Sequence, residues 1–131
     1  MPQENTEIVR RVYERLNRRD VEGVVEPCDD DILMDMSGRV FNPDTYRGHE
    51  GIRRFHDDVV ECWESYRWDV EETRVAGDSV VAMLHCTGHT REGPEVDWHV
   101  AWLWNLRDGK PVFVRFFRER ADALEAAGMM E

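Results

Sequence analysis

Four strand-like runs, following one another closely in the second half of the chain, constrain the fold most. They cover about residues 67–76, 79–90, 95–106 and 111–119, and they are rich in β-branched and aromatic side chains. Only short segments separate them: Gly77-Asp78, residues 91–94 and Asp108-Gly109. Short turns of this composition between β-rich runs are typical of hairpins. The sequence therefore predicts an antiparallel meander of four consecutive strands.

Apolar residues at helical spacing predict helices outside the meander. The helices are expected at residues 6–19, 21–26, 49–65 and 121–127. Asn5 or Thr6 is expected to cap the first helix, Asp20 the second, and Gly128 is expected to end the last one. A short strand is expected at residues 32–36, followed by a loop that leads to the third helix.

Helices that are segregated from an antiparallel sheet define an α+β fold. The chain of 131 residues is long enough for one domain, residues 1–131, and contains no linker or repeat. A sheet bent around three N-terminal helices leaves a concavity between the layers, and such a concavity favours a small-molecule ligand.

Charge and composition exclude several classes of partner. The 17 Lys and Arg residues against 28 Asp and Glu residues give a net charge of −11, which argues against nucleic acid and anionic membranes. No run of about 18 apolar residues is present. Three widely spaced cysteines favour reduced thiols. Because residues 1–5 also lack the features of a signal peptide, we expect a soluble, cytoplasmic protein.

The strand expected at residues 95–106 is apolar on both faces. Trp98, Trp102 and Trp104 lie on one face, and Ala101 and Leu103 lie on the other. A strand with one solvated face would alternate more cleanly. We therefore expect one face to close the cavity and the other to form a homodimer interface through the outer sheet face; scattered exposed apolar groups are the alternative.

Three stretches resemble a known superfamily. Residues 12–20 (VYERLNRRD), residues 46–52 (YRGHEGI) and the end from residue 106 to residue 128 are similar to the SnoaL-like branch of the nuclear-transport-factor-like proteins. The resemblance implies a cone-shaped, curved antiparallel sheet wrapped around three N-terminal helices, with a short C-terminal helix. The superfamily includes ketosteroid isomerases, polyketide cyclases, epoxide hydrolases, dehydratases and members that are not enzymes, so fold alone does not give an activity.

The resemblance implies one catalytic carboxylate. The general-base aspartate of the isomerases falls on Asp35, whereas their oxyanion tyrosine and aspartate fall on Val12 and near Trp102. The Asp-Arg-Asp trio of the epoxide hydrolases is not matched. If Asp35 shares the cavity with Leu33, desolvation favours its protonated form, which suits a general acid or base. Alternatively, Asp35 bonds loop amides or an arginine at the strand end.

Histidines are the other candidates for proton transfer. His85 lies in the middle of a mostly apolar strand, and the resemblance implies that its side chain points inward, where it polarises a carbonyl or relays a proton. His56, on the apolar face of the third helix, is a second candidate. For His85 the alternative is a neutral histidine that is hydrogen-bonded to a neighbour, and for His56 it is a core histidine whose hydrogen bonds are satisfied.

Local spacing predicts no metal site. His85 and His89 are separated by about 13 Å along a strand, too far to share one ion. A metal then requires side chains from distant segments to meet. The sequence also lacks a phosphate-binding glycine-rich loop and a dinucleotide fingerprint, so no cofactor is expected.

Two functions remain open. The first is a small-molecule-binding protein that acts as a cofactor-independent isomerase, cyclase or lyase on a small hydrophobic carbonyl compound, with Asp35 and His85 as catalytic residues. The second is a non-catalytic ligand-binding or dimeric assembly module. Arg118 either meets a carboxylate such as Asp35 or an anionic ligand, or it reaches solvent. The residues expected to line the pocket are Val12, Tyr13, Leu16, Leu33, Tyr46, His56, Val59, Trp63, Met83, Trp98, Trp102, Val114, Phe116 and Arg118.

Overall fold

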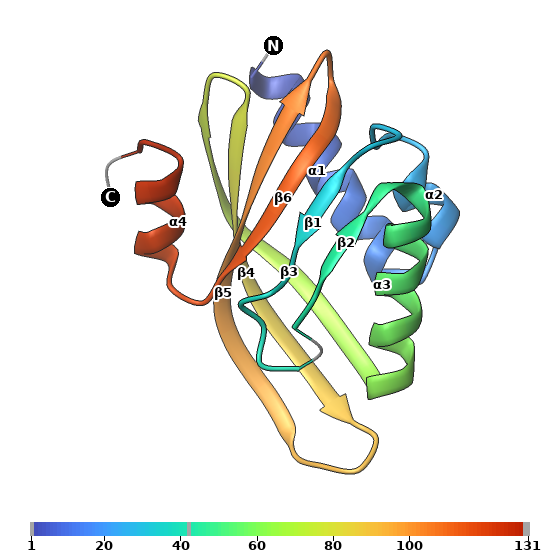
Figure 1. The fold of residues 1–131 in the computed structure, drawn as a ribbon. Helices are drawn as coiled ribbons and strands as arrows, with labels where there is room; N and C mark the ends of the chain where they lie inside the picture. Colours follow the sequence, from blue (N-terminus) through green and yellow to red (C-terminus); the bar gives the residue numbers. More distant parts are fainter. Residues whose placement is uncertain (1, 42, 130–131) are drawn as a thin grey trace.

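The computed structural model describes residues 2–41 and 43–129 (Figure 1). Its helices are α1 (Pro2–Asn17), α2 (Val21–Val25), α3 (Gly48–Cys62) and α4 (Arg120–Ala126). Its strands are β1 (Leu33–Asp35), β2 (Thr45–Arg47), β3 (Trp63–Ala76), β4 (Ser79–Thr90), β5 (Glu95–Arg107) and β6 (Lys110–Phe117). The predicted α+β architecture, with helices first and a four-strand meander after them, is confirmed.

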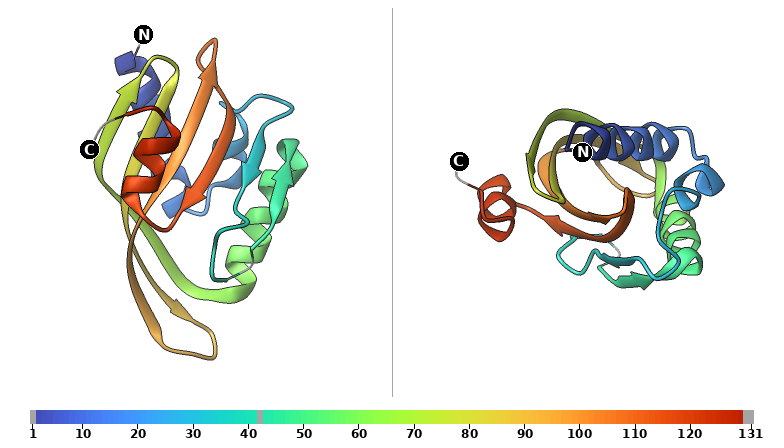
Figure 2. Two further views of the ribbon diagram at one scale, coloured as in Figure 1. Left: turned by 60° about the vertical axis from the view of Figure 1, so that its left-hand side comes forward. Right: turned by 90° about the horizontal axis from the view of Figure 1, so that it is seen from above.

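The strands form one sheet in the order β2-β1-β6-β5-β4-β3. The meander from β3 to β6 is antiparallel, as predicted. The short strand β1 pairs parallel with β6, so the sheet is mostly and not entirely antiparallel. Viewed from above, the long strands curl strongly, and this curvature produces the cone (Figure 2).

Helices cover the two faces of the sheet unequally. The first three helices pack on the concave side, whereas α4 stands on the opposite side, against β4, β5 and β6 (Figures 1 and 2). Aromatic side chains fill the interior between sheet and helices, including Tyr13, Trp63, Trp102 and Trp104, all fully buried. None of the helices in the described ranges is long and apolar enough to cross a membrane.

Several predicted signals act as expected at the ends of elements. The side chain of Asp20 accepts a hydrogen bond of 3.0 Å from the amide of Gly23 and so caps α2. Asp108 and Gly109 have φ values of 53° and 76° in the β5–β6 turn, where left-handed backbone matches the twist of the hairpin. Gly128, at φ 73°, follows the C-terminal end of α4.

Some boundaries differ from the prediction. The first helix begins at Pro2 and not at a cap formed by Asn5 or Thr6, because proline suits the first helical position. The third helix ends at Cys62, and Trp63 already belongs to β3. Residues 45–47 were expected in a loop but form β2, which pairs with β1 at the sheet edge.

The outer sheet face is apolar because α4 covers it. Val81, Ala101 and Leu103 pack there with Ala123 and Leu124 of α4. The buried Ala101 and Leu103, from which a second subunit was expected, are thus covered by a helix of the same chain. Homodimerisation through the outer face stays a prediction, which light scattering tests.

Candidate functional site

The first strand presents the opposite face to the cone from the one expected. Ile32, Met34 and Met36 point into the core. Leu33 and Asp35 are only partly buried and lie on the other side of β1, because successive strand residues face opposite ways. The expectation that Leu33 lines the cavity and that Asp35 lies inside it is therefore wrong.

Contacts with neighbouring residues explain the position of the Asp35 side chain. Its Oδ1 accepts hydrogen bonds from the amide and the hydroxyl of Ser37, at 3.1 and 2.5 Å. Its Oδ2 lies 3.9 Å from Nε of Arg115 on β6. These contacts match the alternative of an aspartate at a strand end that bonds the following loop and an arginine.

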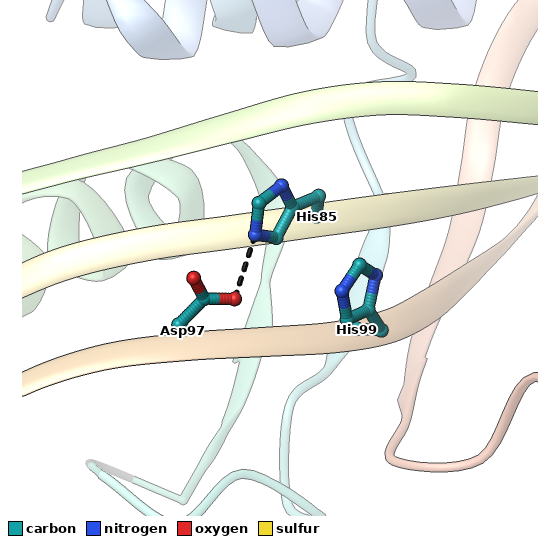
Figure 3. A group of neighbouring side chains, drawn as sticks. All are labelled: His85, Asp97 and His99. Atoms are coloured by element: carbon teal, nitrogen blue, oxygen red, sulfur yellow. Dashed lines mark hydrogen bonds and ion pairs between the residues drawn. The ribbon is translucent and has the colours of Figure 1, made fainter.

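His85 also points away from the interior. On β4, Val80, Leu84 and Cys86 belong to the core, whereas Met83 and His85 lie on the outer face. Nε2 of His85 lies 2.7 Å from Oδ1 of Asp97, and its ring stacks on His99 with centroids 4.5 Å apart (Figure 3). The predicted inward orientation of His85 and of Met83 is wrong, because α4 lets apolar residues occupy both faces of this strand.

Most of the expected pocket-lining residues form solid core. The buried members are Val12, Tyr13, Leu16, Tyr46, Val59, Trp63, Trp102 and Val114. Tyr46 was expected to cover the mouth of the cavity, but it is fully buried and its hydroxyl donates a 2.5 Å hydrogen bond to Asp58. His56 is partly buried on α3.

A cavity of about 300 Å³ opens at the side of the cone. It contains three expected residues, Trp98, Phe116 and Arg118, together with Val40, Asp97, His99 and Val100. Arg118 is exposed, and its Nε donates to the carbonyl of Gly38 at 3.4 Å. This position agrees with the solvent-reaching alternative for Arg118.

Arg39 is the polar residue that the sequence analysis missed. It lies in the segment between β1 and β2, yet it is only 8 % exposed, and its guanidinium carbon lies 5.3 Å from the ring centre of Phe55. Nη1 has no hydrogen-bond acceptor among the described residues, and no carboxylate of these residues forms an ion pair with Arg39. The cone thus contains a buried guanidinium donor, Nη1 of Arg39, without an acceptor among the described residues.

A second unpaired donor lies in the same aromatic region. Nε1 of Trp63 is buried without an acceptor in the described part of the chain. Tyr66 connects the two groups: its ring is 4.7 Å from that of Trp63, and the charge of Arg39 acts on its hydroxyl. Burial raises the pKa of Tyr66 well above its usual value, so its hydroxyl stays protonated.

The sequence identifies the family to which the chain belongs. Residues 9–114 match the model of the SnoaL-like domain. The chain belongs to the SnoaL-like family. A search of curated proteins found no match.

Solved structures show the same SnoaL-like fold. TerC, co-crystallised with polyporic acid, has a TM-score of 0.79 at 23 % identity, over 93 % of this chain and 96 % of that one. A putative SnoaL-like polyketide cyclase from Jannaschia sp. CCS1 has a TM-score of 0.76 at 20 % identity, over 99 % and 95 %. A protein of ketosteroid isomerase-like fold from Catenulispora acidiphila DSM 44928, in complex with trimethylamine, has a TM-score of 0.78 at 17 % identity, over 95 % and 94 %.

The chemistry available in this SnoaL-like cone is that of hydrogen-bond donation. Arg39 and Trp63 supply donors, and aromatic rings surround them. The two expected catalytic groups, Asp35 and His85, lie on β1 and β4 outside the cone interior. The interior therefore suits binding of an acceptor-bearing apolar molecule better than proton abstraction by Asp35.

Proposed function

We propose that the protein binds a small apolar molecule carrying a carbonyl or carboxylate oxygen inside the cone. The observation that supports this function is the pair of buried donors, Arg39 Nη1 and Trp63 Nε1, without acceptors among the described residues. A buried donor without a partner costs about 1–3 kcal/mol, and a charged one costs more. An acceptor supplied by a ligand offsets that cost.

The ligand class follows from the donors and their surroundings. Carbonyl and carboxylate oxygens accept hydrogen bonds, and a carboxylate also neutralises the guanidinium. The rings of Phe55, Trp63 and Tyr66 favour a flat or cyclic apolar body. TerC, which has the same fold, was crystallised with an acid.

Access requires movement of the segment that carries Arg39. Next to it, Val40 lines the 300 Å³ cavity, and Phe41 lines a neighbouring cavity of about 500 Å³ at the end of α3. Phe41 packs between Trp63 and Trp98, with ring centres at 5.1 and 5.9 Å. Displacement of Phe41 joins the outer cavities to the interior and creates room for a ligand.

Binding without proton transfer is the function that the geometry favours. Asp35 and His85 face away from a molecule held by Arg39 in the interior, because both side chains are on the outer side of their strands. Of the two hypotheses from the sequence, the non-catalytic ligand-binding module therefore has the stronger support.

The test follows the indole proton of Trp63 in ¹⁵N-labelled protein. We expect benzoate and acetophenone, which carry an acceptor oxygen, to shift this signal, and ethylbenzene, which has none, to leave it in place. The signal is assigned with Trp63→Phe. Calorimetric titration with benzoate gives the affinity.

Two arginine variants make the test specific. Arg39→Met is expected to weaken benzoate binding at least tenfold, which corresponds to about 1.4 kcal/mol. Arg118→Met, which removes the exposed arginine of the neighbouring cavity, is expected to leave benzoate binding unchanged. If Arg118→Met abolishes binding and Arg39→Met does not, the ligand occupies the outer cavity and the proposed interior site is wrong.

A further inference from the structure

Two histidines and an aspartate meet on the outer face of the sheet (Figure 3). His85 of β4 and His99 of β5 are direct partners in the strand register. Asp97 precedes His99 by two residues and so shares its face. One potential ligand atom from each residue lies within 4.8 Å of those of the other two. The long-range meeting of side chains that a metal site would require thus occurs, between neighbouring strands.

We propose that His85, Asp97 and His99 bind a divalent transition-metal ion such as Zn²⁺ or Co²⁺. Two imidazoles and one carboxylate form a donor set that these ions prefer, whereas Mg²⁺ and Ca²⁺ prefer oxygen ligands alone. Three protein ligands leave further coordination positions for water or a small ligand.

The spacing of the donors requires little rearrangement. Nε2 of His85 and Oδ1 of Asp97 are 2.7 Å apart. Metal–ligand bonds of about 2.0–2.1 Å place adjacent ligand atoms roughly 3 Å apart. The ion would therefore take the place of the proton between these two atoms, and a neutral His85 that binds the ion through Nε2 carries its proton on Nδ1 instead. The two imidazole rings are already parallel within 5°.

A second layer of contacts orients His99. Its Nδ1 lies 3.1 Å from a carboxylate oxygen of Glu71 on β3 and 3.5 Å from Nη2 of Arg120. We assign the ring proton to Nδ1 because the carboxylate is the nearer group, and this leaves Nε2 as the ligand atom. A carboxylate behind a metal-binding histidine fixes its ring and raises its basicity. Arg120 bonds the same carboxylate of Glu71 and holds it in place.

The site is open to solvent and borders a cavity. The side chains of His85, Asp97 and His99 are 31 %, 69 % and 56 % exposed. Asp97 and His99 also line the 300 Å³ cavity that contains Arg118. A bound ion would therefore border this cavity. The site is separate from Arg39 and does not depend on the proposed interior ligand.

The experiment uses untagged full-length protein that has been treated with a chelator and then freed of it. Calorimetric titrations with ZnCl₂ and CoCl₂ are expected to give one binding site per chain, and MgCl₂ is expected to give none. The visible absorption of bound Co²⁺ reports nitrogen and oxygen ligands.

Single variants identify the ligands. His85→Gln, Asp97→Asn and His99→Gln are each expected to lower Co²⁺ affinity more than a hundredfold. Glu71→Gln, which removes a positioning residue, is expected to lower it by about 10–100-fold while the Co²⁺ spectrum keeps its shape. The matched control is His89→Gln. His89 is exposed and lies on the same strand, four residues from His85, and this variant is expected to bind Co²⁺ with wild-type affinity. Circular dichroism verifies that each variant is folded.

Three results would overturn the proposal. The first is the absence of one-to-one Zn²⁺ or Co²⁺ binding by the wild-type chain. The second is a folded His85→Gln or His99→Gln variant that binds with wild-type affinity. The third is a His89→Gln variant that loses binding as the ligand variants do, because the second and third results place the ion elsewhere.

Discussion

Nε1 of Trp104 donates a hydrogen bond of 2.8 Å to the hydroxyl of Tyr13 and so joins β5 to α1 in the core. Both side chains are fully buried, and burial raises the pKa of the Tyr13 hydroxyl well above its usual value. The pair satisfies two polar groups that could not otherwise be accommodated among aromatic rings.

Removal of this acceptor tests how the cone is held together. Tyr13→Phe leaves the indole donor of Trp104 buried and unpaired, so we expect the free energy of unfolding to fall by about 1–3 kcal/mol. Urea unfolding measures the change. A double-mutant cycle with Trp104→Phe isolates the pairwise contribution, and a coupling energy near zero would contradict the assignment.

Arg39→Met is expected to stabilise the protein in the absence of ligand. The substitution replaces a buried guanidinium, whose Nη1 has no acceptor in the described part of the chain, by an apolar side chain of similar length, and we expect the free energy of unfolding to rise by about 1 kcal/mol. Thermal unfolding checks this, with Arg118→Met as the exposed control. A less stable Arg39→Met protein would mean that the guanidinium has a structural role.

Alkaline pH is expected to weaken the fold through two thiols. Burial raises the pKa of Cys28 and of Cys86 to about 12, whereas a thiol in the unfolded chain titrates near 8.5. Between these values the native state binds more protons than the unfolded state, so the free energy of unfolding falls as pH rises. The slope is about 1.4 kcal/mol per pH unit for each thiol.

Urea unfolding at about pH 8 and about pH 10 measures this dependence. Cys86→Ala removes one of the two thiols and is expected to flatten the decline. Cys62→Ala, at a position that is only partly buried, serves as control. An equal decline in Cys86→Ala and in the wild type would exclude Cys86 as a cause.

Asp35→Asn is expected to have little effect on stability or on ligand binding. Asparagine keeps the oxygen that accepts from the Ser37 amide, so the loss of stability should be below about 1 kcal/mol, measured by urea unfolding. Benzoate binding, measured by calorimetry, should be unchanged because Asp35 is outside the cone. Loss of benzoate binding in a folded Asp35→Asn protein would show that this carboxylate contributes to the ligand site.

Periodicity in the sequence predicts the long helices and strands well. It indicates less clearly which face of a short strand is buried. In and beside β1, the set Ile32, Met34 and Met36 is wholly apolar, and this composition identifies the core face better than the position of one aspartate does. In β4, both faces carry buried apolar residues, because α4 covers the outer one. Parity alone therefore could not orient His85.

The positions of the two candidate polar sites, at Arg39 and at the group of His85, Asp97 and His99, depend on contacts between distant parts of the chain. Arg39 lies between β1 and β2, where no periodic pattern indicates burial, and its contact with the ring of Phe55 on α3 is one that local sequence does not reveal. The spacing of Asp97 and His99 does predict a shared face, but their meeting with His85 depends on the β4–β5 register. A shift by one residue in that hairpin would separate them.

The parallel pairing of β1 with β6 joins residues 33–35 to residues 113–115. A nascent chain cannot complete this edge until residues 113–115 have been synthesised and have left the ribosome. Until then the helices and the first hairpins would be only partly folded, and the aromatic interior would be accessible to chaperones. The emergence of β6, and not the growth of the segment before the meander, should be the moment at which this cone closes.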